Sequence, residues 1–539
     1  MPPQGFEILV GLHVDPLISA DFVKQRIGCI DTKVEKLMKI GIDLGSSNTV
    51  AALMSVEGSP ALVPDVNRLG GESTPTKVLL GNDRAFVGQF AERMLDSFPD
   101  QAMITQFKRH FGSSKALAQF QGKPLSSEAL AALVLRKVKH DVEINTSRPV
   151  DLAVITAPAH FNDKQRKTIL RAAEIAGLPV GAILDEPIAA ALFYTHEAHH
   201  LDDEIIMIYD LGGGTFDLTL LTYSANKLHI IAKAGLSDLG GRDFDEIVYG
   251  QLARDYQGVL GHLPSRTQLS ENRLRAFSEH LKLQVNSEKP SWCGDHLFIN
   301  NRFVRFNLDE AAFLKHAVVL LDRTQRLVTR TLRSIGMSLA DVNRLVLTGG
   351  ASNASYVNVY WQRLIDPSRQ KIIRHQPLVS IAKGAAIFAA SLSKSGQQDY
   401  VSSYSMSNVS AYNVGIRLSG PDKFIKMIDR NLPLPVAGRA EVTVPAGAGG
   451  HFSLGLCQYI DQPEDLDLIG QISISRAGLG TASRLEAIVE NKSDGTLGLK
   501  VKNPLTGQSI PFSFERHSGE VGDFAQTKSF VQKISINAI

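Results

Sequence analysis

The chain has 539 residues, of which 57 are Lys or Arg, 55 are Asp or Glu, and 44% are hydrophobic. This length is enough for about three or four domain-sized units, and the near-neutral charge lacks the basic excess of a protein that binds nucleic acid by neutralising many phosphates. Cys29, Cys293 and Cys457 lie far apart without a CxxC motif, which disfavours a disulfide framework or a zinc site. Without a membrane-spanning run or a signal-peptide pattern, we expect a cytoplasmic protein.

Residues 1–37 match nothing later in the chain, and a strand pattern begins abruptly after Met38. Either this segment is an N-terminal extension or Met38 is the true start, and the sequence leaves both readings open. From residue 38 to about 392, apolar runs alternate with helical periods, as in LAVITAP followed by KQRKTILRAAEIAG. This alternation predicts an α/β body with largely buried sheets. Residues 266–284 and 309–335 have the apolar period of long helices.

The amino-acid composition changes at a Ser-rich, Gly-containing stretch over residues 393–408, which we interpret as a linker. Short alternating runs follow it, such as AEVTV, HFSLGLC, QISIS, LEAIV and LGLKV. Asp494-Gly495, between the last two runs, is typical of a hairpin turn. Residues 409–539 are therefore predicted to form an antiparallel β module.

Three apolar runs end in glycine-rich turns: Asp43-Leu44-Gly45-Ser46-Ser47-Asn48, Asp210-Leu211-Gly212-Gly213-Gly214-Thr215 and Thr348-Gly349-Gly350. Taken singly, each is more often an ordinary tight turn. The first two, however, repeat a strand, Asp-Leu-Gly and hydroxyl residues, which favours a duplicated phosphate-binding hairpin with free backbone N–H groups. Asp43 and Asp210 would then face each other across a phosphate chain, where Mg²⁺ held through waters relieves their repulsion.

Seven runs, taken in order, resemble the nucleotide-binding domain of the seventy-kilodalton heat-shock chaperones of the DnaK type: IGIDLGSSNTV, TAPAHFNDKQRKTILRAAEIAGL, ILDEPIAAALFY, DLGGGTFDLTLL, DLGGRDFDE, LVLTGGAS and KGAAIFAA. More weakly, NVGI, MIDRNLPLP, LIGQISIS and LEAIVENKSDGTLGLKV are similar to the family's peptide-binding β-sandwich. The resemblance implies an α/β actin/hexokinase-like ATPase fold, with two lobes around a nucleotide cleft, over residues 38–392. A β-sandwich substrate-binding domain would follow over residues 409–539.

The family's catalytic and phosphate-binding residues have counterparts in this sequence. Lys108 matches the catalytic lysine, whose cation would steady the γ-phosphate and the attacking water, and Glu186 and Asp217 would orient or deprotonate that water. The implied catalytic set is Asp43, Lys108, Glu186, Asp210, Thr215 and Asp217, with Mg²⁺ bound through waters to Asp43 and Asp210. The implied nucleotide-binding set is Gly45, Ser46, Ser47, Asn48, Gly212, Gly213, Gly214, Thr215, Gly240, Gly241, Glu279, Lys282, Asn286, Gly349, Gly350 and Asn353. The cofactors would be ATP or ADP and Mg²⁺, with K⁺ as a further candidate.

The adenosine end departs from the family pattern. Typical members have arginines that stack on adenine where Leu283 and Asn353 stand here, and an Asp where Leu378 stands. We therefore expect an intact phosphate cradle with weaker selectivity for the adenine base.

Coupling between the domains would pass through Pro158 and Arg166, which match the family's proline switch and arginine relay. The family's aliphatic linker is replaced here by the run from Tyr404 to Asn408, and Ala182 replaces an arginine of the surface that docks J-domain partners. We therefore expect weakened coupling to a J-domain co-chaperone.

Ile416, Val442 and Phe452 fall near positions that line the family's peptide cleft. The alternation of apolar residues around Phe452 is equally typical of a sandwich core. The chain ends about where the β module ends, so it is similar to short, divergent, HscC-like members without a helical lid.

These features predict an ATP-dependent chaperone that binds extended apolar segments of unfolded client proteins, with slow hydrolysis switching peptide affinity. The altered linker and base site keep a second reading open, a nucleotide-binding regulatory protein with weakened coupling. A small-molecule kinase of the same superfamily is a third reading, but a kinase has no reason to carry a peptide-binding β-sandwich. The sequence identifies neither the clients nor the nucleotide exchange factor.

Overall fold

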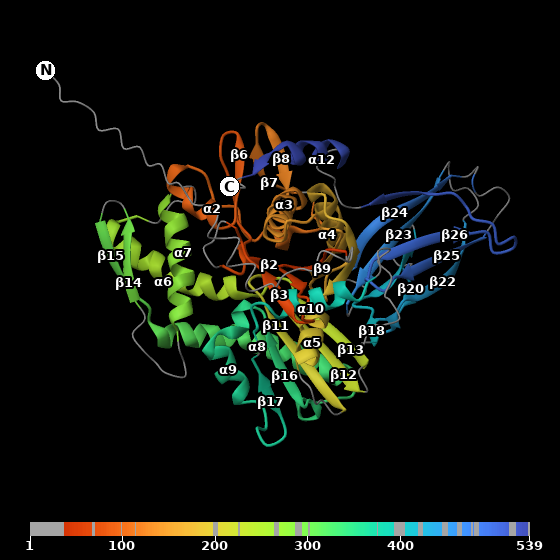
Figure 1. Cartoon of the computed structure of the whole chain (residues 1–539). Coiled ribbons are helices and arrows are strands. Elements are labelled where there is room, and N and C mark those ends of the chain that lie inside the picture. The colour runs from red at the N-terminus through yellow and green to blue at the C-terminus, as the bar shows by residue number, and fades with distance from the viewer. Residues whose placement is uncertain are drawn as a thin grey trace.

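The structure is a computed structural model that describes residues 37–66, 71–98, 100–113, 115–197, 203–224, 227–262, 269–285, 294–299, 302–374, 376–392, 405–418, 424–444, 451–460, 466–475, 478, 484–516 and 524–536. The possible extension before Met38 lies outside these ranges, as do Asn286 and Tyr404. Figure 1 shows an α/β body with the strands of the C-terminal module beside it.

The first lobe is built on a sheet that begins with the predicted glycine-rich hairpin. Its strand order is β10-β9-β1-β2-β3, with β4 beside β2. The hairpin strands β1 and β2 are antiparallel, and β9 then pairs with β1 in parallel, as expected for a helical crossover. Helices α3 and α4 pack on this sheet. The elements are β1 (Lys39–Leu44), β2 (Asn48–Met54), β3 (Pro60–Val63), β4 (Thr74–Pro75), β9 (Leu152–Ala157), β10 (Val180–Asp185), α3 (Ser127–Thr146) and α4 (Asp163–Ala176).

The second lobe repeats this plan around the second hairpin. Its sheet has the order β17-β16-β11-β12-β13-β18-β21, in which β11 and β12 are antiparallel and β16 is parallel to β11. These strands are β11 (Glu204–Leu211), β12 (Phe216–Ser224), β13 (Lys227–Leu236), β16 (Arg344–Thr348), β17 (Lys371–Ile373), β18 (Ser405–Val409) and β21 (Pro433–Leu434). Helices α6 (Gly241–Leu260), α7 (Leu269–Gln284), α8 (Glu310–Ser334) and α9 (Ser355–Gln362) accompany them, with the hairpin β14 (Gly294–Ile299) and β15 (Arg302–Asn307).

Two helices of small residues, α5 (Glu186–Glu197) and α10 (Ser380–Ala390), lie where the lobes meet. Most of their buried alanines belong to one core cluster with strands of both sheets, while Ala382 and Ala386 of α10 pack against β2. A Cβ at Gly384 would lie 1.7 Å from the carbonyl oxygen of Ala189, so only glycine permits this approach of the two helices. The alternation of strands and helices and the predicted two-lobed fold are confirmed.

The C-terminal module is a sandwich of two antiparallel sheets with the orders β20-β19-β23-β24-β27 and β22-β25-β26. Asp494-Gly495 forms the predicted turn, because β25 and β26 pair on either side of it. The strands are β19 (Asn413–Leu418), β20 (Phe424–Ile428), β22 (Val436–Thr443), β23 (His451–Tyr459), β24 (Asp467–Ser475), β25 (Arg484–Asn491), β26 (Leu497–Lys502) and β27 (Ser513–Arg516). The alternating apolar residues of both sheets face one another in a common core.

The C-terminal segment differs from the prediction that residues 409–539 form one β module. Helix α12 (Phe524–Lys533) packs against α3 and α4 of the first lobe, and β28 (Ser535–Ile536) pairs with β6 (Arg84–Val87). In Figure 1, α12 lies over the first lobe beside the labels of β6 and of β8 (Lys123–Ser126). Val531 and Ile534 are buried in the core of that lobe, which gives this segment its apolar contacts. A local apolar pattern does not reveal which distant surface a segment will pack against. For this reason the sequence pattern did not indicate that this segment packs on the first lobe.

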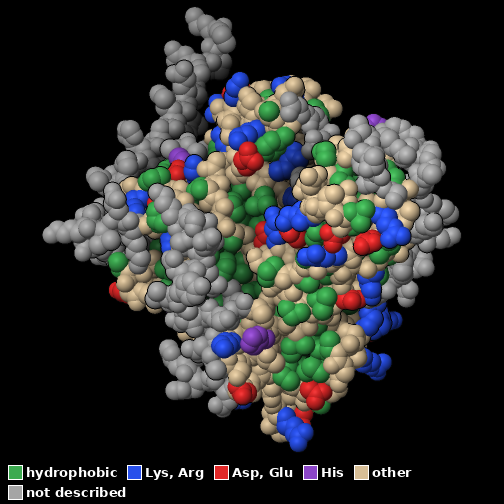
Figure 2. Space-filling view, turned by 90° about the vertical axis from the view of Figure 1, so that its right-hand side faces the viewer, with side chains coloured by type: hydrophobic (Ala, Val, Ile, Leu, Met, Phe, Trp, Pro, Cys, Tyr) green, Lys and Arg blue, Asp and Glu red, His purple; other side chains and the backbone are tan. Residues whose placement is uncertain are grey.

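The surface carries charges of both signs. Figure 2, which views the molecule from the side of the sandwich, shows acidic and basic side chains intermingled across the middle of this face. None of the described helices has both the length and the apolar character needed to cross a membrane.

Candidate functional site

The two glycine-rich turns face each other across the cleft between the lobes. Gly213 in the second turn approaches Ser47 in the first so closely that a Cβ on Gly213 would lie 2.0 Å from Ser47 Oγ. Gly212 N donates to Thr215 O at 3.0 Å and closes the second turn. These turns therefore present backbone N–H groups and hydroxyls to one space, as a phosphate cradle requires.

The third glycine run and the start of α6 complete this cradle. Gly241 N donates to Gly212 O at 2.8 Å, so the α6 N-terminus is tied to the second turn. Gly349 has φ 84°, and a Cβ there would lie 2.3 Å from Asp210 Oδ1. A side chain at Gly349 would therefore clash with Asp210 and with the backbone of Leu211.

These segments enclose a cavity of about 560 Å³, a size typical of small-molecule sites. Most of the predicted nucleotide-binding and catalytic residues line it: Asp43, Gly45, Ser46, Ser47, Asn48, Lys108, Glu186, Asp210, Gly212, Gly213, Thr215, Gly241, Glu279, Lys282, Gly349, Gly350 and Asn353. Gly214 and Gly240 contact each other just behind this lining. Asn286 lies outside the described residues.

The floor of the cavity gathers the carboxylates of Asp43, Glu186 and Asp210 around the ammonium group of Lys108. Lys108, on the 3₁₀ helix η2 (Phe107–His110), lies with Nζ 2.6 Å from Glu186 Oε1, and both side chains are buried. Burial raises the pKa of Asp43 to about 6 and the pKa of Glu186 to about 7, against the opposing charge of Lys108. Burial, followed by repulsion from Glu186 and Asp217, holds the pKa of Asp210 well above its usual range.

This excess of carboxylates fits a cation. Asp210 Oδ2 is buried and has no hydrogen-bond partner among the described residues. Among the described residues, no three His, Cys, Asp or Glu side chains lie close enough together to ligate a metal directly. Asp43 and Asp210 are therefore suited to a hydrated Mg²⁺ that completes its shell with waters and phosphate oxygens.

Asp217, the remaining predicted catalytic residue, lies behind this floor. It is opposite Asp210 in the β11–β12 register, and it is 1% exposed. His160 Nδ1 lies 2.9 Å from its Oδ1. Asp217 is thus held from the side of the first lobe rather than open to the cavity.

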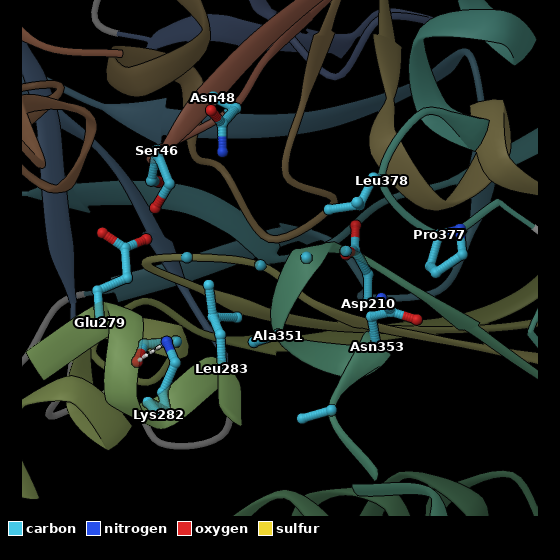
Figure 3. Close-up of a pocket in the computed structure, with 18 of the residues that line it drawn as sticks. Ser46, Asn48, Asp210, Glu279, Lys282, Leu283, Ala351, Asn353, Pro377 and Leu378 are labelled. Carbon is cyan, nitrogen blue, oxygen red and sulfur yellow. Dashed lines mark hydrogen bonds between the residues drawn. The ribbon is translucent and has the colours of Figure 1, made fainter. Parts of the chain in front are cut away.

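The opposite end of the cavity, where a base would lie, carries two exposed leucines among its polar groups. In Figure 3, Glu279, Lys282 and Leu283 lie on the side of α7, while Asn353, Pro377 and Leu378 lie across the pocket from Glu279. Leu283 and Leu378 are 71% and 55% exposed. Lys282 Nζ lies 2.6 Å from Asp245 Oδ1, so its charge is paired within the second lobe. Leucines here supply apolar contact but no stacking cation.

Sequence reasoning missed Arg374 and Asp245, which also line the cavity. Arg374 Nη2 donates to Asn353 O at 2.7 Å and so brings a guanidinium to the base end from outside any recognised motif. Asp245 lies within the run DLGGRDFDE, two residues after Asp243. Its place in that run was the signal that could have identified it as a site residue. Arg374 had no such signal, because only the fold brings the end of β17 to the cavity.

The predicted coupling residue Arg166 lies in a buried charge cluster between the domains. Its Nη2 is 2.7 Å from Asp185 Oδ1, and Lys233 Nζ is 2.8 Å from the other carboxylate oxygen. Arg166 Nη1 also donates to Asp494 O of the sandwich at 3.0 Å. Pro158 precedes this cluster, and its carbonyl accepts from Phe161 N at 3.0 Å.

The end of the linker joins the same cluster. β18 pairs in parallel with β13, and Lys233 Nζ donates to Asn408 Oδ1 at 2.9 Å. Strand pairing uses backbone groups, so it does not require the aliphatic side chains whose absence was noted in the sequence.

The three predicted peptide-contact residues pack inside the sandwich. Ile416, Val442 and Phe452 are 0%, 1% and 7% exposed and belong to its core cluster. In this conformation they are core residues, and their role in peptide contact stays a prediction.

Comparison with known proteins agrees with this architecture. The family profile described as "Hsp70 protein" matches residues 114–447. The proteins named "Chaperone protein DnaK" from two strains of Halobacterium salinarum, R1 and NRC-1, are each 28% identical over 495 residues, which cover 89% of this chain and 75% of theirs. With the two-lobed body, the glycine cradle and the sandwich, this match shows that the chain is a divergent member of the Hsp70 family.

Proposed function

We propose that the chain is an ATP-dependent molecular chaperone, in which hydrolysis of Mg-ATP switches the affinity of the sandwich for extended apolar segments of unfolded proteins. The observation that carries this proposal is the cavity floor. A buried Lys108–Glu186 pair lies there beside Asp43 and Asp210, between two glycine turns that provide a phosphate cradle. Residues 38–392 would form the ATPase domain, and the sandwich would begin after β18.

The residues of the floor suit hydrolysis of a phosphate anhydride. The glycine turns and the hydroxyls of Ser46, Ser47 and Thr215 would bind phosphate oxygens through fixed donors. Lys108 would place a positive charge beside the transferred phosphoryl group, where positioned charge contributes most to catalysis. Glu186, whose pKa is raised to about 7 by burial, is suited to accept a proton from water near neutral pH.

Mg²⁺, when bound through Asp43 and Asp210, would neutralise phosphate charge and fix the orientation of the phosphate chain. Asp217, which lies behind the floor, would act on the water indirectly, through its negative charge beside Asp210 and Glu186.

Contacts between the domains support the proposed coupling. Arg166 binds Asp185 of the ATPase body and the carbonyl of Asp494 in the sandwich, so a shift of either body changes the surroundings of the same side chain. Asn408, at the end of the linker, contacts the same cluster by accepting a hydrogen bond from Lys233. J-domain and exchange-factor partners would act on this coupling from outside.

A single-turnover measurement of ATP hydrolysis by the full chain tests the proposal. We expect slow, Mg²⁺-dependent hydrolysis whose rate changes when an unfolded peptide is added. Binding of ATP without hydrolysis would favour a regulatory protein, and transfer of phosphate to a small-molecule acceptor would favour a kinase.

A further inference from the structure

Gln106 lies immediately before η2, the 3₁₀ helix that carries Lys108, and its backbone conformation is unusual. Its φ of 57° and ψ of 19° place it in the left-handed region, which is unfavourable for a glutamine. Unfavourable backbone conformations of this kind persist where the surrounding structure requires them, and they are common at functional sites. Here the left-handed residue sets where η2 begins, two residues before Lys108.

The side chain of Gln106 lies where the first two glycine-rich turns meet. Its Nε2 is 3.5 Å from Ser47 Oγ in the first turn. In the second turn, a Cβ at Gly214 would lie 2.9 Å from Gln106 Oε1 and 2.8 Å from Ser46 Oγ. The missing side chain of Gly214 therefore leaves the space that the Gln106 amide occupies between the turns.

The segment that follows Gln106 is bonded to the same second turn. Arg109 Nε donates to Gly214 O at 2.9 Å, and Arg109 Nη2 lies 2.8 Å from Asp243 Oδ2. Asp243 also accepts from Gly240 N at 2.7 Å, at the start of α6. These bonds from the first lobe hold the second turn in place beside the Gln106 amide.

The amide of Gln106 is only partly satisfied in this structure. Its Oε1 is buried and has no hydrogen-bond partner among the described residues. The contact of Nε2 with Ser47 Oγ, at 3.5 Å, is at the outer limit for a hydrogen bond. Because a buried polar atom without a partner is destabilising, this amide is suited to a ligand that accepts from Nε2 and to a group that donates to Oε1. A phosphate oxygen can do the first, and a water molecule can do the second.

The cavities give both groups access to this point. Ser46 and Ser47 line the nucleotide cavity, and a second cavity of about 530 Å³ is lined by the same two serines together with Gln106. A terminal phosphate bound by the serines would therefore lie next to the amide, and the second cavity has room for water.

We propose that the Gln106 amide recognises the terminal phosphate of a bound nucleoside triphosphate. Its Nε2 donates to an oxygen of that phosphate, and its Oε1 accepts from a water molecule beside it. The inference rests on the proposed ATPase function, and it adds a residue that distinguishes the triphosphate from the diphosphate product. A diphosphate is one phosphate group shorter, so it leaves the amide without this partner.

Gln106→Asn, made in the full chain, separates recognition from a structural role. Asparagine keeps the amide and adopts the left-handed region more readily than glutamine, but its side chain is one methylene shorter. We compare the affinity for the β,γ-imido analogue of ATP with the affinity for ADP, both with Mg²⁺. The ratio of the two should fall about 10- to 100-fold, as for loss of a hydrogen bond to a charged group, with ADP affinity within about twofold of wild type.

Hydrolysis and stability provide two further readouts of the same variant. Single-turnover hydrolysis should slow by about 10-fold or more, because the water loses a fixed partner. The midpoint of denaturant unfolding of the nucleotide-free chain should not fall, because asparagine suits this backbone better than glutamine. A merely structural role predicts the reverse, with unchanged nucleotide selectivity and altered stability.

Gln121→Asn is the matched control. Gln121 is also a left-handed glutamine, with φ 50°, in the exposed turn between β7 (Ala116–Phe120) and β8. This control should leave the affinity ratio and hydrolysis unchanged. Gln106→Gly permits the left-handed backbone without any amide, and it should lose the preference for the triphosphate as the Asn variant does. An unchanged ratio in either Gln106 variant, equal affinity of wild type for the two nucleotides, or a matching loss of ADP affinity would overturn the inference.

The same measurements separate this inference from the proposed function. If wild type prefers the triphosphate analogue through Gln106 but does not hydrolyse ATP, the proposed function fails and the role of Gln106 in phosphate recognition stands. If wild type hydrolyses ATP and the Gln106 variants match its rate and its affinity ratio, the inference fails by itself.

Discussion

Lys108 Nζ lies 2.6 Å from Glu186 Oε1 at the floor of the cleft. The two residues are far apart in the chain, because Lys108 lies on η2 of the first lobe and Glu186 begins α5, where the lobes meet. The pair is buried among three further carboxylates, so it meets a strongly negative environment. In this setting Lys108 is the group that we propose to supply the positive charge that phosphate binding and phosphoryl transfer both need.

Lys108→Ala should abolish hydrolysis while ATP still binds. The loss should be about 100-fold or more, because a positioned charge acts mainly on the transition state. Quenched-flow hydrolysis and equilibrium binding of labelled ATP separate the two effects. The exposed Lys115→Ala is the matched control, and hydrolysis by Lys108→Ala at the control's rate would show that another group supplies the charge.

Binding of Mg-nucleotide should strengthen as pH rises and level off above about 7. Burial raises the pKa of Asp43 to about 6 and that of Glu186 to about 7, so both hold protons in the free protein at lower pH. A cation must displace these protons, and its affinity therefore falls as pH decreases through this window. Calorimetric titrations across the window measure the effect.

Glu186→Gln provides the control for this pH dependence. The titration of the nucleotide itself is common to both proteins, so only the part that belongs to Glu186 should disappear in the variant. Identical pH profiles for wild type and variant would mean that Glu186 is ionised throughout.

Selectivity for adenine should be weak and should rise in Leu283→Arg. A guanidinium stacked on the base is worth about 1–2 kcal/mol, or about five- to thirty-fold in affinity. The ratio of ATP to GTP affinity by calorimetry measures this gain, and Leu283→Lys, which lacks the planar group, should gain less. A preference of wild type for ATP of many thousand-fold would show that other groups, such as Arg374, already recognise the base.

The C-terminal segment should stabilise the first lobe. Ile534 is 3% exposed in the core of that lobe, and Ile534→Ala should reduce the free energy of unfolding by about 2–4 kcal/mol. Leu505→Ala is the matched control, since Leu505 is 93% exposed and its loss should cost less than about 0.5 kcal/mol. Denaturant unfolding compares the two variants, and equal effects would mean that the segment does not remain docked in solution.

Several features of the fold and site were predictable because they depend on local patterns. Glycine after Asp-Leu marks the turns at Gly45 and Gly212, and alternation marks strands such as β23. Other features depend on contacts between distant segments, which local patterns do not encode. Arg374 reaches the cavity from a strand end, and α12 covers a lobe that precedes it by hundreds of residues.

The linker shows a further limit of composition. The run ending at Asn408 lacks aliphatic residues, which predicted weak coupling, yet its backbone pairs with β13 and the Asn408 side chain contacts Lys233. Backbone pairing tolerates many sequences, so composition alone does not decide whether the linker docks.

Release of a labelled apolar peptide from the full chain, followed by stopped flow in ATP and in ADP, tests the central claim most directly. If nucleotide state is coupled to the sandwich through Arg166 and Asn408, release should be about fivefold or more faster in ATP. Lys108→Ala, which we expect to bind ATP without hydrolysing it, should retain this acceleration. Asn408→Ala should reduce it without changing release in ADP. Equal release rates in ATP and ADP, or no binding of extended apolar peptides in either state, would contradict the account.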